Sequence, residues 1–302
     1  MLDFWIVNFK GELAALSAAF LWALSAVVYG RLGQHLSPLI LNLSKGAIAI
    51  ALLSCTLILQ GDRFPEVSFT LVGLLLLSGI LGIGLGDTFY FNALNSLGAR
   101  RTLLIESLAP PLAALIALIS LQESLSLTAW TGILLTITGV AWVISERLPH
   151  TNSNTASQPH LRGISFALLA ALGQAIGAVL SRAALAETSI SPLWSTLLRL
   201  VGGELMLLLW LPFQRPAGAW FKPLASSRMI GAIAVTAFFS TYLGIWLQQT
   251  ALKFTATGVA QALISTSPLF VLPVAIWLGE QVSYRAILGV LVALGGIVLL
   301  FN

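Results

Sequence analysis

Charged side chains are scarce in this sequence. Of its 302 residues, 15 are Lys or Arg and 11 are Asp or Glu, so that 9% are charged and 58% are hydrophobic. An average soluble domain is about 25% charged, and so few charges do not cover the surface of a globule of this length. The scarcity excludes an ordinary cytosolic enzyme and a disordered chain. It indicates instead that most of the surface faces lipid.

Cysteine and histidine are scarce as well. The single cysteine, Cys55, excludes an internal disulfide. The three histidines lie in expected loops, at His35, His150 and His160, and form no metal-binding pattern, so we expect no metal and no other cofactor. The net charge of +4 comes from basic residues that are spread along the chain rather than clustered. This spread argues against nucleic acid as a partner.

Enzyme motifs are also nearly absent. The sequence contains no His-Glu-x-x-His, no Gly-x-Ser-x-Gly and no Gly-x4-Gly-Lys-Ser/Thr. The string Gly84-Leu85-Gly86-Asp87 matches the Gly-x-Gly-Asp of intramembrane aspartyl proteases, which need a second aspartate. The other two aspartates, Asp3 and Asp62, lie outside the apolar stretches. We therefore expect no enzyme and no catalytic residue, and an intramembrane enzyme or a membrane scaffold is a remote alternative.

Long apolar stretches fill most of the chain. A helix that crosses a bilayer needs about 20 mainly apolar residues, and backbone groups in lipid need the internal hydrogen bonds of a helix. We therefore predict an all-α polytopic membrane protein with ten transmembrane helices. They are expected at 11–31, 38–59, 68–92, 101–121, 128–146, 162–183, 192–212, 228–251, 257–278 and 284–301.

The two halves of the chain repeat each other. Gly11 matches Gly163 at an offset of 152, and Ala93 matches Ala251 at an offset of 158. Other matched positions follow the same order, namely Pro38 and Pro192, Lys45 and Arg199, Pro110 and Pro268, Glu123 and Glu280, Gly132 and Gly289, and Gly139 and Gly296. We divide the chain into repeat 11–147, a polar linker 148–161 and repeat 162–302. Five helices per repeat predict halves of inverted orientation around a central cavity, the arrangement of alternating-access transporters.

The repeated motifs also carry a family resemblance. Each half contains Ser-Pro-x6-Lys/Arg, an Ala-Leu pair, a Pro-containing helix, Leu-x-Glu-x-[Leu/Val]-Ser and Gly-x6-Gly. These motifs resemble two EamA domains of the drug/metabolite transporter superfamily. The resemblance implies a cavity lined mainly by the first, third and fourth helices of each repeat, and export of amino acids or related metabolites. The chain departs from the family pattern at Lys45, where Arg is usual, and at Gln174, where Trp is frequent.

Five charged residues lie within the expected spans: Lys45, Asp87, Glu106, Arg199 and Glu204. Charges inside a membrane are costly and usually face a cavity or a partner. Lys45 and Arg199 either anchor their helices or bind a substrate anion. Asp87 either binds substrate or a proton, or pairs with Lys45 or Arg101. Glu204 is five residues from Arg199 and does not share its helix face, so we expect it to pair structurally elsewhere.

Glu106 lies four residues before Pro110. Proline has no backbone N–H and leaves the carbonyl of the fourth preceding residue without its helical donor. We therefore expect helix kinks at Pro110 and at its counterpart Pro268. Ile264 occupies the position equivalent to Glu106. Because the acid is not repeated, we favour a functional role for Glu106.

Further polar and amphipathic side chains lie in the helices expected to line the cavity. The substrate-binding candidates are Trp22, Asp87, Tyr90, Glu106, Gln174, Trp246, Gln248 and Gln261. Asn92, Tyr242 and Gln249 belong to the same wider set, of which about half should only join helices to one another. Glu123 and Glu280 are expected to cap helices or tie loops.

These features predict a secondary-active exporter of small polar metabolites in a bacterial inner membrane, as a monomer or homodimer. Its expected partners are a small-molecule substrate, the lipid bilayer and protons. A passive facilitator, or an importer of a nucleobase-like or vitamin-like solute, is the alternative. The mixed charges favour zwitterionic or polar substrates. Orientation stays open, because the resemblance implies termini inside whereas the positive-inside rule favours an outside N-terminus.

Overall fold

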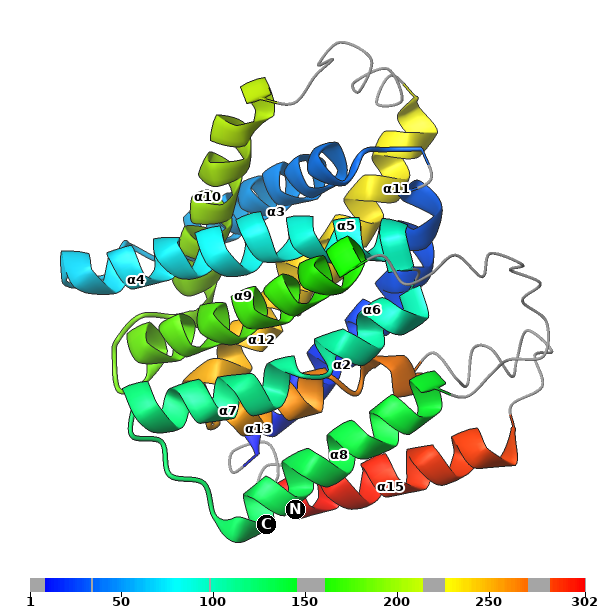
Figure 1. Ribbon diagram of the computed structural model, residues 1–302. Helices are drawn as coiled ribbons and strands as arrows, with labels where there is room; N and C mark the ends of the chain where they lie inside the picture. The colour runs from blue at the N-terminus through cyan, green and yellow to red at the C-terminus, as the bar shows by residue number, and fades with distance from the viewer. Residues whose placement is uncertain are drawn as a thin grey trace.

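The structure is a computed structural model that describes residues 9–33, 35–97, 99–145, 161–213, 226–270 and 283–301. These residues form helices and short connections and contain no strand, as Figure 1 shows. The predicted all-α class is thereby confirmed. Glu280 and the expected linker 148–161, apart from Leu161, lie outside the described residues.

Helices of the first half run in chain order as follows: α2 (Lys10–Leu32), α3 (Pro38–Gln60), α4 (Phe69–Gly79), η1 (Ile80–Gly86), α5 (Asp87–Leu97), α6 (Ala99–Glu106), α7 (Ala109–Ser120) and α8 (Leu127–Ser145). Those of the second half are α9 (Leu161–Leu185), α10 (Pro192–Trp210), η2 (Leu211–Phe213), α11 (Ser227–Ala237), η5 (Phe238–Leu243), α12 (Gly244–Phe254), α13 (Thr257–Ile264) and α15 (Tyr284–Leu300). Both η1 and η5 are π-helical turns inside longer helices.

Seven helical spans within the described residues are long and apolar enough to cross a membrane. They are Pro38–Gln60, Phe69–Leu97, Thr102–Ser120, Leu127–Ser145, Leu161–Leu185, Pro192–Trp210 and Ser227–Phe254. The chain is therefore a multi-pass membrane protein. The expected spans 11–31 and 284–301 correspond to α2 and the shorter apolar α15, and the span 257–278 begins with α13. The count of ten stays a prediction.

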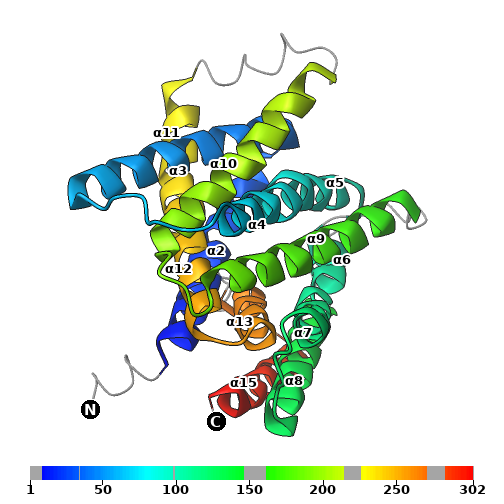
Figure 2. The ribbon, with the colours of Figure 1, turned by 90° about the vertical axis from the view of Figure 1, so that its left-hand side faces the viewer.

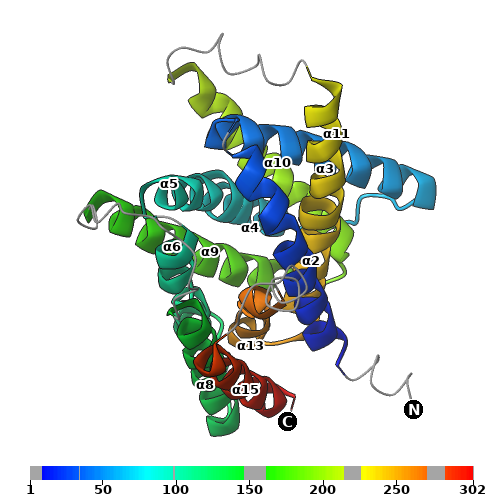
Figure 3. The same cartoon turned by 90° about the vertical axis from the view of Figure 1, so that its right-hand side faces the viewer.

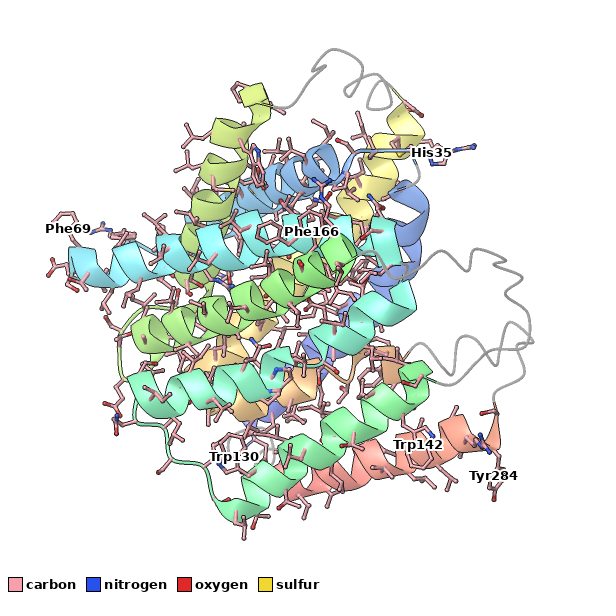
Figure 4. All side chains as sticks on the ribbon, viewed as in Figure 1. His35, Phe69, Trp130, Trp142, Phe166 and Tyr284 are labelled. Atoms are coloured by element: carbon pink, nitrogen blue, oxygen red, sulfur yellow. The ribbon has the colours of Figure 1, made fainter. Side chains whose placement is uncertain are left out.

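The surface carries the large apolar side chains that a lipid environment requires. Phe69 at the start of α4 is 96% exposed, and Leu127 and Leu161 are also exposed. Figure 4 shows Phe69 extending from the N-terminal end of α4, and Trp130 and Trp142 near opposite ends of α8. Tryptophans at helix ends are typical of membrane interfaces.

The Ser-Pro pairs begin two equivalent helices. The hydroxyl of Ser37 accepts a hydrogen bond from the Ile40 N–H, and that of Ser191 accepts one from the Trp194 N–H. Pro38 and Pro192 occupy the first turn, where their missing N–H groups leave no helical hydrogen bond unmade. Each half therefore starts its second helix with the same cap.

The last helices of the two halves, α8 and α15, lie side by side in Figures 1 and 3. Their contact is built on glycine. A Cβ atom at Gly296 would overlap the backbone nitrogen of Thr136, and one at Gly139 would overlap that of Ala293. Small residues let helix backbones approach closely, which is how helices associate where lipid is the solvent.

The change Gly296→Ala is expected to lower stability by about 1–3 kcal/mol, because the new methyl group meets backbone that cannot rotate away. Gly295→Ala is the matched control, since its Cβ would meet only the Leu135 side chain at 3.7 Å. The measurement is the temperature at which half of the purified protein is no longer monodisperse in detergent. Equal temperatures for the two variants would show that α8 and α15 are not packed this way.

Candidate functional site

A cavity of about 710 Å³ lies among helices of both halves. Its wall includes residues of α2, α3, η1, α5, α6, α7 and α8 from the first half and of α9, α10, η5, α12 and α13 from the second. Cavities that bind small molecules are typically 300–1,000 Å³. The volume of this cavity is therefore suitable for a small metabolite.

Most residues singled out from the sequence border this cavity. They are Trp22, Lys45, Asp87, Tyr90, Glu106, Pro110, Gln174, Arg199, Gln248, Gln261 and Pro268. Trp246 and Glu204 are not part of its wall. Trp246 packs with Tyr242 and Ile245. The Glu204 carboxylate lies directly against Gly46 of α3, and its Oε1 atom has no hydrogen-bond partner among the described residues.

Three of the wider set join helices or bond locally, outside the cavity wall. The Gln249 Oε1 atom accepts a hydrogen bond from the Ser195 hydroxyl at 2.8 Å, which links α12 to α10. The Tyr242 and Thr56 hydroxyls lie 2.9 Å apart and link η5 to α3. Asn92 donates to the Thr88 carbonyl of its own helix.

Lys45 and Asp87 form an ion pair at the cavity wall. The Lys45 Nζ atom lies 2.7 Å from Asp87 Oδ2, with 10% and 19% of the two side chains exposed. The same ammonium faces the rings of Phe91 and Tyr29, at 5.6 and 5.9 Å from their centroids, within the range of cation–π attraction. Lys45 is one of the two partners expected for Asp87, and the side chain of the other, Arg101, lies outside the described part of the structure.

Gln174 connects this ion pair to the second half. Its Nε2 atom donates to Asp87 Oδ1 at 3.2 Å and to the Gly82 carbonyl of η1 at 3.5 Å. α9 runs close to η1, because a Cβ at Gly177 would meet Gly82 Cα at 3.2 Å. Asp87 is thus held by one residue from each half of the chain.

Trp22 makes the corresponding contact in the opposite direction. Its indole Nε1–H donates to the Ser240 carbonyl of η5 at 2.7 Å. Gln174 follows Trp22 at the repeat offset of 152, and Ser240 follows Gly82 at the offset of 158. The first helix of each half therefore donates to the equivalent carbonyl in the π-helical turn of the other half.

The helix that carries Glu106 is interrupted at this residue. α6 ends at Glu106 and α7 begins at Ala109, with Pro110 and Pro111 in its first turn. The equivalent helix α13 ends at Ile264, four residues before Pro268. Glu106 forms no ion pair among the described residues, and its buried Oε1 atom has no hydrogen-bond partner there.

Arg199 is almost wholly buried, with 1% of its surface exposed. Its Nη1 atom donates to Gln248 Oε1 at 3.2 Å, and its Nε atom has no partner among the described residues. A Cβ at Gly82 would lie 3.1 Å from Arg199 Nη2, so the guanidinium reaches η1. Arg199 therefore meets the π-helical turn that Gln174 also contacts.

Glu123 lies away from the cavity and joins the loop before α8 to α9 and to the start of α13. It accepts hydrogen bonds from Arg182 Nε at 2.6 Å and from the Thr257 N–H at 2.9 Å. The second bond places a carboxylate at the start of α13, where a helix favours negative charge.

Sequence reasoning missed Tyr29 and Ser240, which both border the cavity. Their hydroxyl oxygens lie 2.6 Å apart and join α2 to η5. The repeat offset links Ser240 to Gly82, which lies two residues before the string Gly84-Leu85-Gly86-Asp87, and this was the available signal. No sequence signal indicated Tyr29, because the equivalent residue in the second half, Ser181, is small and its hydroxyl contacts that of Ser78 instead.

Comparison with known proteins agrees with this architecture. The model of the EamA-like transporter family matches residues 9–145 and 161–302. The chain belongs to the EamA-like transporter family. The match covers both repeats and confirms the resemblance to two EamA domains of the drug/metabolite transporter superfamily. This EamA-like transporter has no match among curated proteins.

Solved structures show the same fold as this EamA-like transporter, with 29 similar chains found. One of them, titled "Crystal structure of protein", superposes with a TM-score of 0.77 at 18% identity. The alignment covers 97% of this chain and 96% of that one. At this identity the likeness concerns the fold alone.

Proposed function

We propose that this membrane transporter is a secondary-active exporter of small polar metabolites, amino acids or related compounds, that works by alternating access. In this proposal ten helices, arranged as two inverted repeats, cross a bacterial inner membrane. The observation that carries the proposal is the cavity, whose mainly apolar wall contains charged residues of both halves, Lys45, Asp87 and Glu106 from the first and Arg199 from the second.

Support for the inverted repeat comes from the reciprocal contacts of Trp22 and Gln174. An approximate twofold relation between the halves requires that contacts between them occur in pairs. The bonds from Trp22 to Ser240 and from Gln174 to Gly82 form such a pair. Because each bond joins a first helix to a π-helical turn of the other half, these are the points about which the halves would rock.

Energy for export would come from a gradient, since the sequence has no nucleotide-binding motif. Protons are the proposed coupling ion. Asp87, which borders the cavity beside Lys45, is the proposed site of this coupling. A passive facilitator would move the same solutes without responding to a pH gradient.

The test compares intracellular and extracellular metabolite pools in cells with and without the gene, followed by counterflow of the affected solutes in proteoliposomes. Export predicts intracellular accumulation when the gene is absent, and proton coupling predicts flux that responds to an imposed pH gradient. Depletion inside the cells would indicate import instead. Unchanged pools together with no counterflow would overturn the transport proposal.

A further inference from the structure

Among the described residues, four charged side chains border the cavity, and only two of them form an ion pair with each other. Lys45 and Asp87 form the ion pair at 2.7 Å. Glu106 and Arg199 take part in no ion pair among the described residues. The described part of the wall therefore presents one negative group and one positive group that lack an ion-pair partner. Each belongs to a different half of the chain.

Glu106 lies where several negative groups converge. It is the last residue of α6, and the C-terminal end of a helix carries partial negative charge. Pro110 and Pro111 cannot donate to the carbonyls of Glu106 and Ser107, because proline has no backbone N–H. The buried Oε1 atom of Glu106 also lacks a hydrogen-bond partner among the described residues. An ammonium group, with three N–H donors and a positive charge, satisfies these acceptors together.

Arg199 lacks acceptors rather than donors. Its guanidinium offers five N–H donors, of which the described residues engage one, in the bond from Nη1 to the neutral Gln248 amide. A charge removed from water in this way is costly unless a partner of opposite sign approaches it. The side chain borders the cavity although only 1% of its surface is exposed. A carboxylate at this wall fits the fork of the guanidinium.

We propose that the cavity binds a dipolar substrate by both ends, with its ammonium group at Glu106 and its carboxylate at Arg199. The inference rests on the proposed transport function and assigns the two charged residues that select the substrate. A singly charged solute leaves one of the two groups uncompensated, so it binds more weakly than the zwitterion. Because the ends bind α6 and α10, the substrate joins the two halves while it is bound.

The test is competition during counterflow in proteoliposomes, with the best-transported standard L-amino acid as the labelled probe. Three unlabelled competitors are compared: the same amino acid, its N-acetyl derivative, which lacks the ammonium, and its carboxamide, which lacks the carboxylate. In the unaltered protein the zwitterion should compete about tenfold or more better than either derivative, as the loss of a charge-assisted hydrogen bond implies.

Each substitution should remove one of the two preferences. Glu106→Gln should abolish the preference for the zwitterion over the N-acetyl derivative and keep the preference over the carboxamide. Arg199→Gln should do the reverse. Glu106→Asp retains the charge and should retain both preferences. The controls are Glu66→Gln and Arg228→Gln, at exposed positions outside the cavity wall, which should leave both preferences unchanged.

Several results would overturn this inference while leaving transport intact. One is counterflow in which all three competitors act equally on the unaltered protein. Another is loss of both preferences together in the folded Glu106→Gln variant. A third is flux that requires sodium in a manner dependent on Glu106, because the bound cation would then be sodium rather than the substrate ammonium. Absence of counterflow for every amino acid would instead contradict the proposed amino-acid substrates.

Discussion

Gly79→Ala is expected to destabilise the protein by about 3 kcal/mol or more, at the upper end of what overpacking costs. Gly79 is the last residue of α4. This helix packs across α10, and the two helices can be followed in Figure 2. A Cβ atom at Gly79 would overlap the backbone carbonyl of Arg199. Since backbone atoms cannot move aside as side chains do, the methyl group must separate the two helices.

The same change should also reduce transport, because Arg199 moves with its backbone. Gly73→Ala, on the same helix, is the control, since a Cβ there would meet nothing within 4 Å. Thermal stability in detergent and counterflow per folded molecule are the two measurements. A Gly79→Ala variant as stable and as active as Gly73→Ala would contradict the close crossing of α4 and α10.

Asp87→Asn is expected to abolish transport and to cost about 3–5 kcal/mol of stability, the range observed when one partner of a buried ion pair is removed. The substitution leaves the ammonium of Lys45, whose side chain is 10% exposed, without its carboxylate. Adding Lys45→Met to Asp87→Asn should recover most of the stability, because this double variant has no unpaired charge. The double variant should still fail to transport, since the cavity has lost the ion pair.

The pair formed by Arg182 and Glu123 provides the control. It has a similar N···O distance, 2.6 Å, and similar burial, but neither residue borders the cavity. Glu123→Gln should lower stability while leaving counterflow per folded molecule within about twofold of the unaltered protein. Equal loss of flux in Asp87→Asn and Glu123→Gln would show that the ion pair at the cavity is only structural.

Much of the fold could be predicted because lipid imposes simple rules on a sequence. The apolar stretches, the Ser-Pro caps and the repeat offsets placed most helices, including those that begin at Pro38 and Pro192. The cost of burying charge predicted that Lys45, Asp87 and Arg199 would meet a partner or a cavity, and it left open which of the two each would meet. These inferences need only composition and spacing.

The parts that were not predicted depend on contacts between distant residues. The π-helical turn η5 has no signal in the sequence, and its place at the cavity is recognised only from the hydrogen bonds that Trp22 and Tyr29 form with Ser240. Glu204 was expected to find a partner, yet it lies against Gly46 with its Oε1 atom unpartnered among the described residues. Trp246 was expected at the cavity, but its ring packs against Tyr242 and it is not part of the cavity wall.

Substrate should cross the membrane through this cavity, and the chain is suited to a test of this passage by cysteine modification. Cys55, the only cysteine, is replaced by serine, and Ser265, which borders the cavity, is replaced by cysteine. Ser227→Cys in the same background is the control, at an exposed position outside the cavity wall.

Counterflow is then measured before and after reaction with a bulky methanethiosulfonate reagent. We expect modification at position 265 to stop counterflow, substrate to slow that modification, and modification at position 227 to leave flux unchanged. Undiminished flux through fully modified cysteine at position 265 would contradict the claim that substrate crosses the membrane through this cavity.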